Sequence, residues 1–233
     1  MKQAEAVAAF DRLASRYDAW YTTPLGAFAN AREQALLFEL TKVRPGEQAL
    51  DVGCGTGNYT LALAQRGIQA MGVDLSLAML AMAISKAKEA KLPVGYSQAT
   101  AENLPFPAEN FDLVVSVTTL EFVVSPQAAV AEMMRVLRPT GRLVVGVLNA
   151  MSLWSLVYRR RKGTIYEQAN FFSPAALLRL LQPYGATTWR SCVFIPPWYA
   201  GQPEAAVMDW ERFSAFLFQP FGAFLVASVE KRR

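Results

Sequence analysis

Three alternating glycines between an apolar run and a helical segment constrain this chain more than any other feature. Residues 50–58 read LDVGCGTGN; the run over 48–52 predicts a strand, and 56–66 predicts a helix with Gly67 as its C-cap. Glycines at such a junction let a ligand approach the backbone, and the helix N-terminus offers free N–H groups. Ligands of open α/β sheets bind beyond the carboxyl ends of the strands. We therefore interpret the segment as a ligand-binding loop, with a tight turn without a ligand as the alternative.

Short apolar runs alternate with helical segments along the rest of the chain. The predicted strands cover 68–73, 94–97, 111–117, 143–148, 187–195 and 223–229, and the predicted helices cover 76–90, 125–138 and 173–183. This alternation predicts an α/β fold: a Rossmann-like, doubly wound, mainly parallel seven-stranded sheet with helices on both faces. The connection over 196–221 has room for little beyond one helix, so we expect the last strand to be antiparallel.

A helical N-terminal region precedes the sheet. Residues 4–40 place aromatic and apolar side chains at spacings of three and four, with an interruption at Pro24-Leu25-Gly26. No internal repeat or low-complexity linker divides the chain. We therefore expect a single domain over 1–233, with a helical cap (1–45), a ligand-binding core (46–150) and a region with insertions and the last strands (151–233).

Composition excludes several kinds of chemistry. The chain contains no histidine, which excludes histidine-based triads, histidine-ligated zinc and histidine general bases. Its only cysteines, Cys54 and Cys192, exclude a disulfide scaffold and a multi-thiolate metal site. The uncharged run from Leu143 to Tyr158 is shorter than the roughly 20 residues that cross a bilayer. We expect a soluble cytoplasmic protein without a metal.

The spacing of the glycines limits which kinds of ligand the loop can bind. The dinucleotide fingerprint G-x-G-x-x-G/A fails from either starting glycine, because its last position holds Asn58 or Thr60. The spacing therefore argues against a nicotinamide oxidoreductase. Asp74 ends the second strand and can accept both hydroxyls of a ribose, although a helix-opening acid is the alternative.

Five segments in this order resemble the class I S-adenosylmethionine-dependent methyltransferases. More narrowly, they resemble the type 11 group, which includes the ubiquinone and menaquinone biosynthesis methyltransferases. The matching segments are LDVGCGTG (50–57), VDLS (73–76) with Met79-Leu80, AENLPF (101–106), RVLRPTG (135–141) and Tyr17-Asp18-x-Trp20. The resemblance covers nearly the whole chain, with 46–150 as the donor-binding core and 151–233 as the acceptor-side region.

The resemblance implies a set of contacts with S-adenosylmethionine, whose product is S-adenosylhomocysteine. The expected contacts are Asp51, Gly53, Cys54, Gly55 and Gly57 for the methionine part, Asp74 for the ribose, Leu75, Met79, Ala101 and Glu102 for the adenine, and Thr118 near the sulfonium. Thr100 departs from the family, which usually has an aspartate there. Its neutral hydroxyl is a weaker acceptor for the adenine amino group than a carboxylate.

Methyl transfer is an in-line displacement that needs positioning more than acid–base chemistry, so the missing histidine is no obstacle. The candidate acceptor-side residues are Tyr17, Tyr21, Glu121 and Arg32. Glu121 follows the fourth strand and would be a base near the methyl site, or else a surface carboxylate on a loop. For the two tyrosines, packing under the cap is the alternative to proton transfer.

The acceptor pocket is expected to lie between the cap and two aromatic-rich insertions. Those aromatic residues are Trp154, Tyr158, Tyr166, Phe171 and Phe172 in 149–172, and Trp198, Tyr199, Trp210, Phe213, Phe216 and Phe218 in 196–220. An aromatic pocket suits a small apolar or aromatic acceptor. Packing of the extra helices, or a surface for a partner subunit, are the alternatives.

Methyl transfer to such a small molecule is the predicted function. A macromolecule (RNA or protein) methyltransferase and a non-catalytic S-adenosylmethionine-binding protein are the alternatives. The basic run over 159–162 would suit an anionic acceptor, a membrane or RNA, but a net charge of only +4 favours a solvated loop. We therefore expect neither nucleic-acid nor membrane contact.

Overall fold

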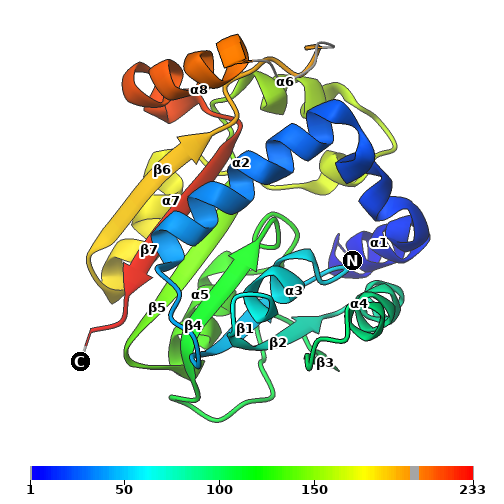
Figure 1. Cartoon of the computed structure of the whole chain (residues 1–233), viewed down its shortest axis with the longest axis vertical. Coiled ribbons are helices and arrows are strands. Elements are labelled where there is room, and N and C mark those ends of the chain that lie inside the picture. The colour runs from blue at the N-terminus through cyan, green and yellow to red at the C-terminus, as the bar shows by residue number, and fades with distance from the viewer. Residues whose placement is uncertain (1, 200–204, 233) are drawn as a thin grey trace.

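The computed structural model describes residues 2–199 and 205–232. Its centre is one seven-stranded sheet with the order β3-β2-β1-β4-β5-β7-β6 (Figure 1). Strand β7 pairs antiparallel with both of its neighbours, and every other pair is parallel. The strands are β1 (Gln48–Val52), β2 (Gln69–Asp74), β3 (Gly95–Gln98), β4 (Phe111–Val117), β5 (Leu137–Leu148), β6 (Thr187–Cys192) and β7 (Phe224–Glu230). The predicted fold class and the reversed last strand are confirmed.

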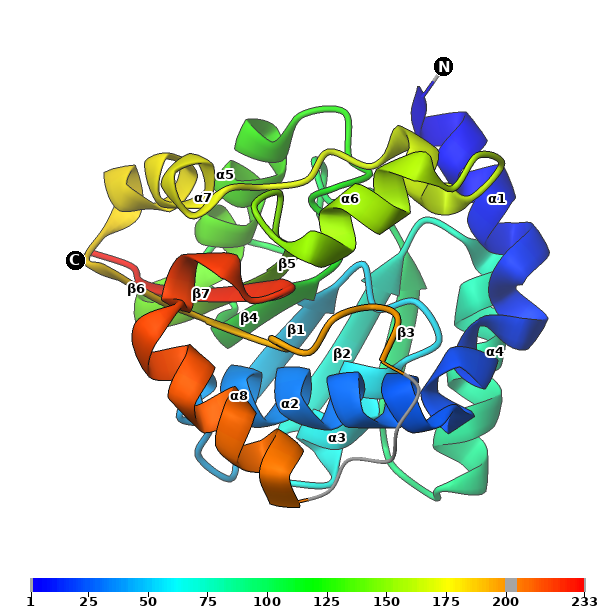
Figure 2. The ribbon, with the colours of Figure 1, turned by 90° about the horizontal axis from the view of Figure 1, so that it is seen from above.

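Helices cover both faces of the sheet (Figure 2). One face carries α2, α3 and α8, and the other carries α5 and α7, while α1 packs against α4 beside the edge formed by β3. The helices are α1 (Lys2–Tyr17), α2 (Pro24–Thr41), α3 (Asn58–Ala64), α4 (Leu77–Glu89), α5 (Pro126–Val136), α6 (Leu153–Arg160), α7 (Pro174–Leu181) and α8 (Ala205–Leu217), with 3-10 turns η1 (Asp18–Thr22), η2 (Ile165–Gln168), η3 (Gln182–Tyr184) and η4 (Gln219–Phe221).

The burial of strand side chains explains the layered arrangement. Most of β4 and the second half of β5, residues 143–148, are apolar because both of their faces are covered. One buried cluster, including Met133 and Leu177, lies between the sheet and α5 and α7. A second cluster, including Leu37 and Leu63, lies between the sheet and α2 and α3. Predicted helix starts also hold, since Ser125 and Ser173 accept hydrogen bonds from backbone N–H groups three residues on.

Two predicted strands differ from the structure by three residues or more at one end, and the interruption predicted at 24–26 lies instead at η1, because Pro24 begins α2. Strand β6 ends at Cys192 rather than 195, because Val193 adopts a φ of 64° and the backbone N–H groups of 193–195 donate to the carboxylate of Glu211. Strand β5 begins at Leu137 rather than 143, directly after α5. The single helix expected in 196–221 is α8.

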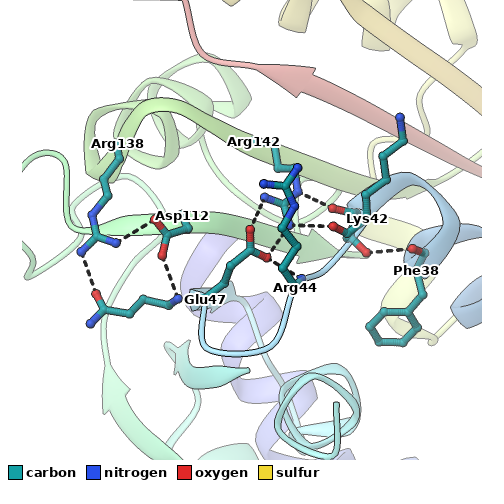
Figure 3. A network of polar contacts seen from close by, with 9 residues as sticks. Phe38, Lys42, Arg44, Glu47, Asp112, Arg138 and Arg142 are labelled. Atoms are coloured by element: carbon teal, nitrogen blue, oxygen red, sulfur yellow. Dashed lines mark hydrogen bonds and ion pairs between the residues drawn. The ribbon is translucent and has the colours of Figure 1, made fainter. Parts of the chain in front are cut away.

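Charged side chains join the amino ends of the central strands (Figure 3). Arg142 donates to both carboxylate oxygens of Glu47, at 2.9 and 2.6 Å, and also to the carbonyl of Thr41 at the end of α2. Arg138 donates to Asp112 at 2.7 Å, and Asp112 accepts the N–H of Gln48 at 2.9 Å. This network ties α2, β1, β4 and β5 together at the edge opposite the glycine loop.

Candidate active site

A cavity of about 730 Å³ lies at the carboxyl ends of β1, β2 and β4, under α1 and η1. Its volume falls within the range of small-ligand sites, about 300–1,000 Å³. The glycine loop, the ends of β2 and β4 and the start of the 99–110 loop form one side. Side chains from α1, η1, α2, α6 and the segment 163–167 form the other side. The cavity therefore brings the sequence motifs together with residues that are distant in the chain.

The three loop glycines have different surroundings, although all have positive φ. A Cβ on Gly53 would lie 2.1 Å from Oγ1 of Thr119, and a Cβ on Gly57 would lie 2.7 Å from the hydroxyl of Tyr96. A Cβ on Gly55 would meet no atom within 4 Å, and this residue lines the cavity. Gly55 thus leaves open backbone for a ligand, whereas Gly57 lies outside the cavity lining and allows close packing on α4.

Two carboxyl groups support the loop from the strand ends. Asp74 accepts the N–H of Gly55 at 2.8 Å through one oxygen and the N–H of Ser76 at 2.9 Å through the other. Burial raises the pKa of Asp74, and these backbone hydrogen bonds oppose the shift. Asp51 is almost fully buried, accepts a 2.6 Å hydrogen bond from Thr60, and has its pKa raised by burial to about 7. Both line the cavity.

Most of the other expected donor contacts also reach the cavity. Those that line it are Cys54, Leu75, Met79, Thr100, Ala101 and Thr118. Thr118 adopts a φ of 49°, a strained conformation for a β-branched residue that is typical of functional sites. Glu102 does not line the cavity; one of its oxygens accepts the N–H of Val124 at 2.9 Å, just before α5.

The acceptor-side candidates divide into two groups. Tyr17 and Tyr21 line the cavity with their rings 6.1 Å apart. Burial raises the pKa of Tyr17, and hydrogen bonds with Tyr21 and Thr118 oppose that shift. Glu121 and Arg32 lie outside the lining residues.

Glu121 lies outside the cavity lining, and one of its oxygens is buried without a hydrogen-bond partner among the described residues. Its side chain is fully buried, so the alternative of a surface carboxylate is wrong. One oxygen accepts the N–H of Leu148 at 2.7 Å, and burial raises the pKa of the carboxyl to about 8. The residue thus ties the end of β5 to the loop after β4, rather than facing the cavity as a base near the methyl site would.

Glu33 is a cavity residue that sequence reasoning did not single out. It lies on α2 and lines the cavity beside Tyr17, Tyr21 and Tyr59. Burial raises its pKa to about 8. The helical pattern around it gave no signal, because a charged residue at that position is ordinary for a surface face.

Among the described residues, the first aromatic-rich insertion contributes to the cavity and the second does not. Tyr158 and Tyr166 line it and stack with their ring centroids 4.1 Å apart. No described residue of 196–220 lines it; residues 200–204 lie outside the described part of the chain. The expectation that this second insertion forms the pocket is therefore corrected. Several of its aromatic side chains are exposed instead: Trp198, Trp210, Phe213, Phe216 and Phe218.

A polar clasp fastens the N-terminal cap onto the glycine loop. One oxygen of Asp18 accepts hydrogen bonds from Thr56 at 2.7 Å and from Asn58 at 3.1 Å, and the other pairs with Lys86 at 2.7 Å. Asp11 accepts a 2.5 Å hydrogen bond from Ser76. The cap thereby covers the donor end of the cavity.

Two negative findings concern the described residues only. Within residues 2–199 and 205–232, no group of three or more histidine, cysteine or acidic side chains is placed to hold a metal. No helix in the same ranges has the length and apolar character needed to cross a bilayer.

Comparison with known proteins gives consistent matches. The family described as "Methyltransferase domain" matches residues 50–145. A ubiquinone biosynthesis O-methyltransferase of Methylococcus capsulatus is 37% identical over 145 residues, which cover 58% of this chain and 60% of that protein. An uncharacterised protein of Methanocaldococcus jannaschii is 28% identical over 178 residues, which cover 76% of this chain and 80% of that protein.

Solved structures share the fold along nearly the whole chain. A Thermotoga maritima protein, described as an S-adenosylmethionine-dependent methyltransferase and a possible histamine N-methyltransferase, superposes with a TM-score of 0.75. It is 24% identical, with 98% of this chain and 100% of that chain covered. Phosphoethanolamine N-methyltransferase 2 of Haemonchus contortus, in complex with S-adenosylmethionine, superposes with a TM-score of 0.64 at 18% identity, over 96% of this chain and 60% of that chain. The glycine loop, the sheet order, the family match over residues 50–145 and the Methylococcus relative support a class I S-adenosylmethionine-dependent methyltransferase of the type 11 group.

Proposed function

We propose that this protein transfers a methyl group from S-adenosylmethionine to a small molecule with an apolar or aromatic body. The observation that carries the proposal is the shared cavity: the glycine loop and the tyrosines of α1, η1, α6 and η2 line the same space of about 730 Å³. Both substrates of a displacement must meet in one water-poor site, and this cavity offers one.

The donor half fits S-adenosylmethionine in its chemistry. Gly55 leaves open backbone where a larger residue would fill the space, and the carboxyl of Asp74 stands at the end of β2 to accept ribose hydroxyls. Leu75, Met79 and Ala101 give an apolar surface for the adenine. When bound, the donor supplies a methyl group on a positively charged sulfur.

The chain's own residues orient the substrates and exclude water. Thr118 and Tyr17 form a polar link from the end of β4 to the cap, in the middle of the cavity. Phe10 of α1 packs edge-on against Phe122 at 5.0 Å and helps to close the cavity from above. An enclosed aromatic site favours a small acceptor over a polymer. The name of the Methylococcus relative also supports a small-molecule acceptor.

Methyl transfer from radiolabelled S-adenosylmethionine into a cell extract tests the proposal. The extract is fractionated into small molecules, lipids, RNA and protein, and the Asp74→Ala variant is the control for donor-dependent labelling. We expect label in the small-molecule or lipid fraction with wild-type protein. Label in RNA or protein would overturn the small-acceptor proposal, and the basic run over 159–162 would then be the first region to examine.

A further inference from the structure

Glu33 presents a carboxyl group to the acceptor half of the cavity with no protein partner of opposite charge. It lines the cavity, and no hydrogen bond or ion pair joins it to any other described residue. The neighbouring Glu39 on the same helix differs, because it is exposed and pairs with Arg190. Glu33 is half-buried and lines the cavity, and a perturbed carboxyl in a cavity that has no protein partner is a candidate for contact with a ligand.

Aromatic hydroxyl side chains from separate elements surround this carboxyl. Burial raises the pKa of five tyrosines, and the charge of Glu33 adds to each rise: Tyr17 on α1, Tyr21 on η1, Tyr59 on α3, Tyr158 on α6 and Tyr166 on η2. The hydroxyl of Tyr59 is buried and has no hydrogen-bond partner in the described chain. Two independent features, an unpaired carboxyl and an unpaired hydroxyl, therefore face one ligand space.

We propose that the methyl acceptor is an amine, that the tyrosines hold its ammonium form, and that Glu33 takes its proton before methyl transfer. The proposal rests on the proposed function and names the chemical class of its acceptor. A cation over aromatic rings gains the attraction of their electron-rich faces, and a carboxylate completes the cage. A neutral hydroxyl acceptor offers no positive charge to pair with this carboxyl, so it would not favour the ionised form.

The reaction balances with one proton transferred to the protein. The ammonium gives a proton to a carboxylate oxygen of Glu33, which leaves a neutral amine with a free lone pair. That lone pair forms a new C–N bond to the methyl carbon while the C–S bond breaks, and the bonding electrons remain on sulfur as a neutral thioether. The product is a methylated ammonium ion, and Glu33 later releases its proton to water.

The environment of Glu33 matches this role. Because burial raises its pKa to about 8, proton transfer from an ammonium is only moderately uphill. The titratable groups that face it are the five tyrosines named above and Cys192 on β6, and burial raises the pKa of each. The charge of Arg161 opposes part of the rise in the pKa of Tyr158 and Tyr166, which burial dominates.

Calorimetry with a matched probe pair tests the proposal on the full chain loaded with S-adenosylhomocysteine. The probes are 2-phenylethylamine and 2-phenylethanol, which share an aromatic body and differ in the charged nitrogen. We expect wild-type protein to bind the amine at least about tenfold more tightly than the alcohol, and Glu33→Gln to lose that preference. Glu39→Gln, on the same helix but outside the cavity, should retain it.

Proton release distinguishes direct contact from a merely structural role. Below pH 8 the carboxyl of Glu33 is protonated, so binding of an ammonium at pH 7 should release about one proton, measured from the heats in two buffers. The release should fall towards zero above pH 8, where the carboxyl is already ionised. Glu33→Gln should show no release at either pH.

Three results would overturn the amine proposal. They are equal or tighter binding of the alcohol, failure of both probes to bind at millimolar concentration, and proton release that persists in Glu33→Gln. Passing the labelled small molecules over a cation-exchange resin separates the two proposals. Label that is not retained would refute an amine acceptor alone, whereas label in RNA or protein would refute the small-molecule function itself.

Discussion

The donor half of the cavity is built mainly from backbone atoms and side chains at three strand ends, whereas the acceptor half is built from long side chains on six separate helical segments. Gly55 and Asp74 are joined by a 2.8 Å hydrogen bond although 19 residues separate them. Tyr21, Glu33 and Tyr158 come from η1, α2 and α6, and they share the acceptor half only because the fold brings these elements together around the cavity.

The two halves differ because binding of the methyl donor is common to the family, whereas binding of the acceptor is specific to each member. All members of a donor-binding family bind one molecule, and backbone geometry at a parallel sheet edge suffices for it. The acceptor varies between relatives, and single side chains on a cap and on insertions select it. Substitutions in the two halves should therefore affect different affinities.

The largest expected effect comes from Asp74→Ala. The substitution removes the acceptor for ribose hydroxyls together with the partners of the Gly55 and Ser76 N–H groups. We expect donor affinity to fall by about 1–3 kcal/mol in calorimetry, and Asp74→Asn to lose less. Unchanged donor affinity in Asp74→Ala would mean that the carboxylate of Asp74 does not contact the donor.

Gly55→Ala should weaken donor binding by about tenfold, because the new methyl group occupies space that the ligand uses. Gly46→Ala is a matched control: it also has positive φ and open surroundings, but lies in the turn before β1. Both variants should lose about 1 kcal/mol of stability from backbone strain. Equal donor affinities for the two variants would mean that Gly55 does not face the ligand.

Tyr21→Phe tests whether a residue of the acceptor half affects acceptor binding without affecting donor binding. The variant loses a hydroxyl that hydrogen-bonds with Tyr17 but keeps the ring. We expect the KM for the acceptor to rise several-fold while donor affinity stays constant. Tyr184→Phe in η3, away from the cavity, should change neither quantity; a loss of donor affinity in Tyr21→Phe would show that the halves are not separable.

The smallest effect is expected from Asp18→Asn in the clasp. Burial raises the pKa of Asp18, but hydrogen bonds with Lys86, Thr56 and Asn58 together outweigh it, so the pKa is lowered. Its stabilising effect, about 0.5 kcal/mol for this half-exposed pair, is therefore complete above the ordinary pKa of 3.8 and is lost as the pH falls through the lowered value.

Urea unfolding of Asp18→Asn and wild type across this pH range measures the difference. The free energies of unfolding of the two proteins should become equal at low pH. As a control, Asp209→Asn removes the exposed Asp209–Arg212 ion pair of α8 and should show no such pH-dependent difference from wild type. A difference that grows as the pH falls would contradict the clasp.

Most of the fold and the donor half were predictable from sequence, and the acceptor half was not. The alternation of apolar runs and helices fixes a parallel sheet, and the loop around Gly55 and Asp74 is local in sequence. Gly57 and Glu102 belong to the donor-binding motifs but lie outside the cavity lining. A sequence motif does not show which of its residues contact the ligand and which pack against the rest of the protein. Only the crossing of α2 over the sheet reveals that Glu33 enters the cavity while Glu121 is buried elsewhere.

The central claim is that one cavity holds donor and acceptor in separable halves. Measuring the affinities for S-adenosylhomocysteine and for 2-phenylethylamine in Gly55→Ala and Glu33→Gln tests it most directly. We expect Gly55→Ala to lose affinity for S-adenosylhomocysteine alone and Glu33→Gln to lose affinity for the amine alone. Loss of both affinities in either variant, with the fold intact by circular dichroism, would contradict it.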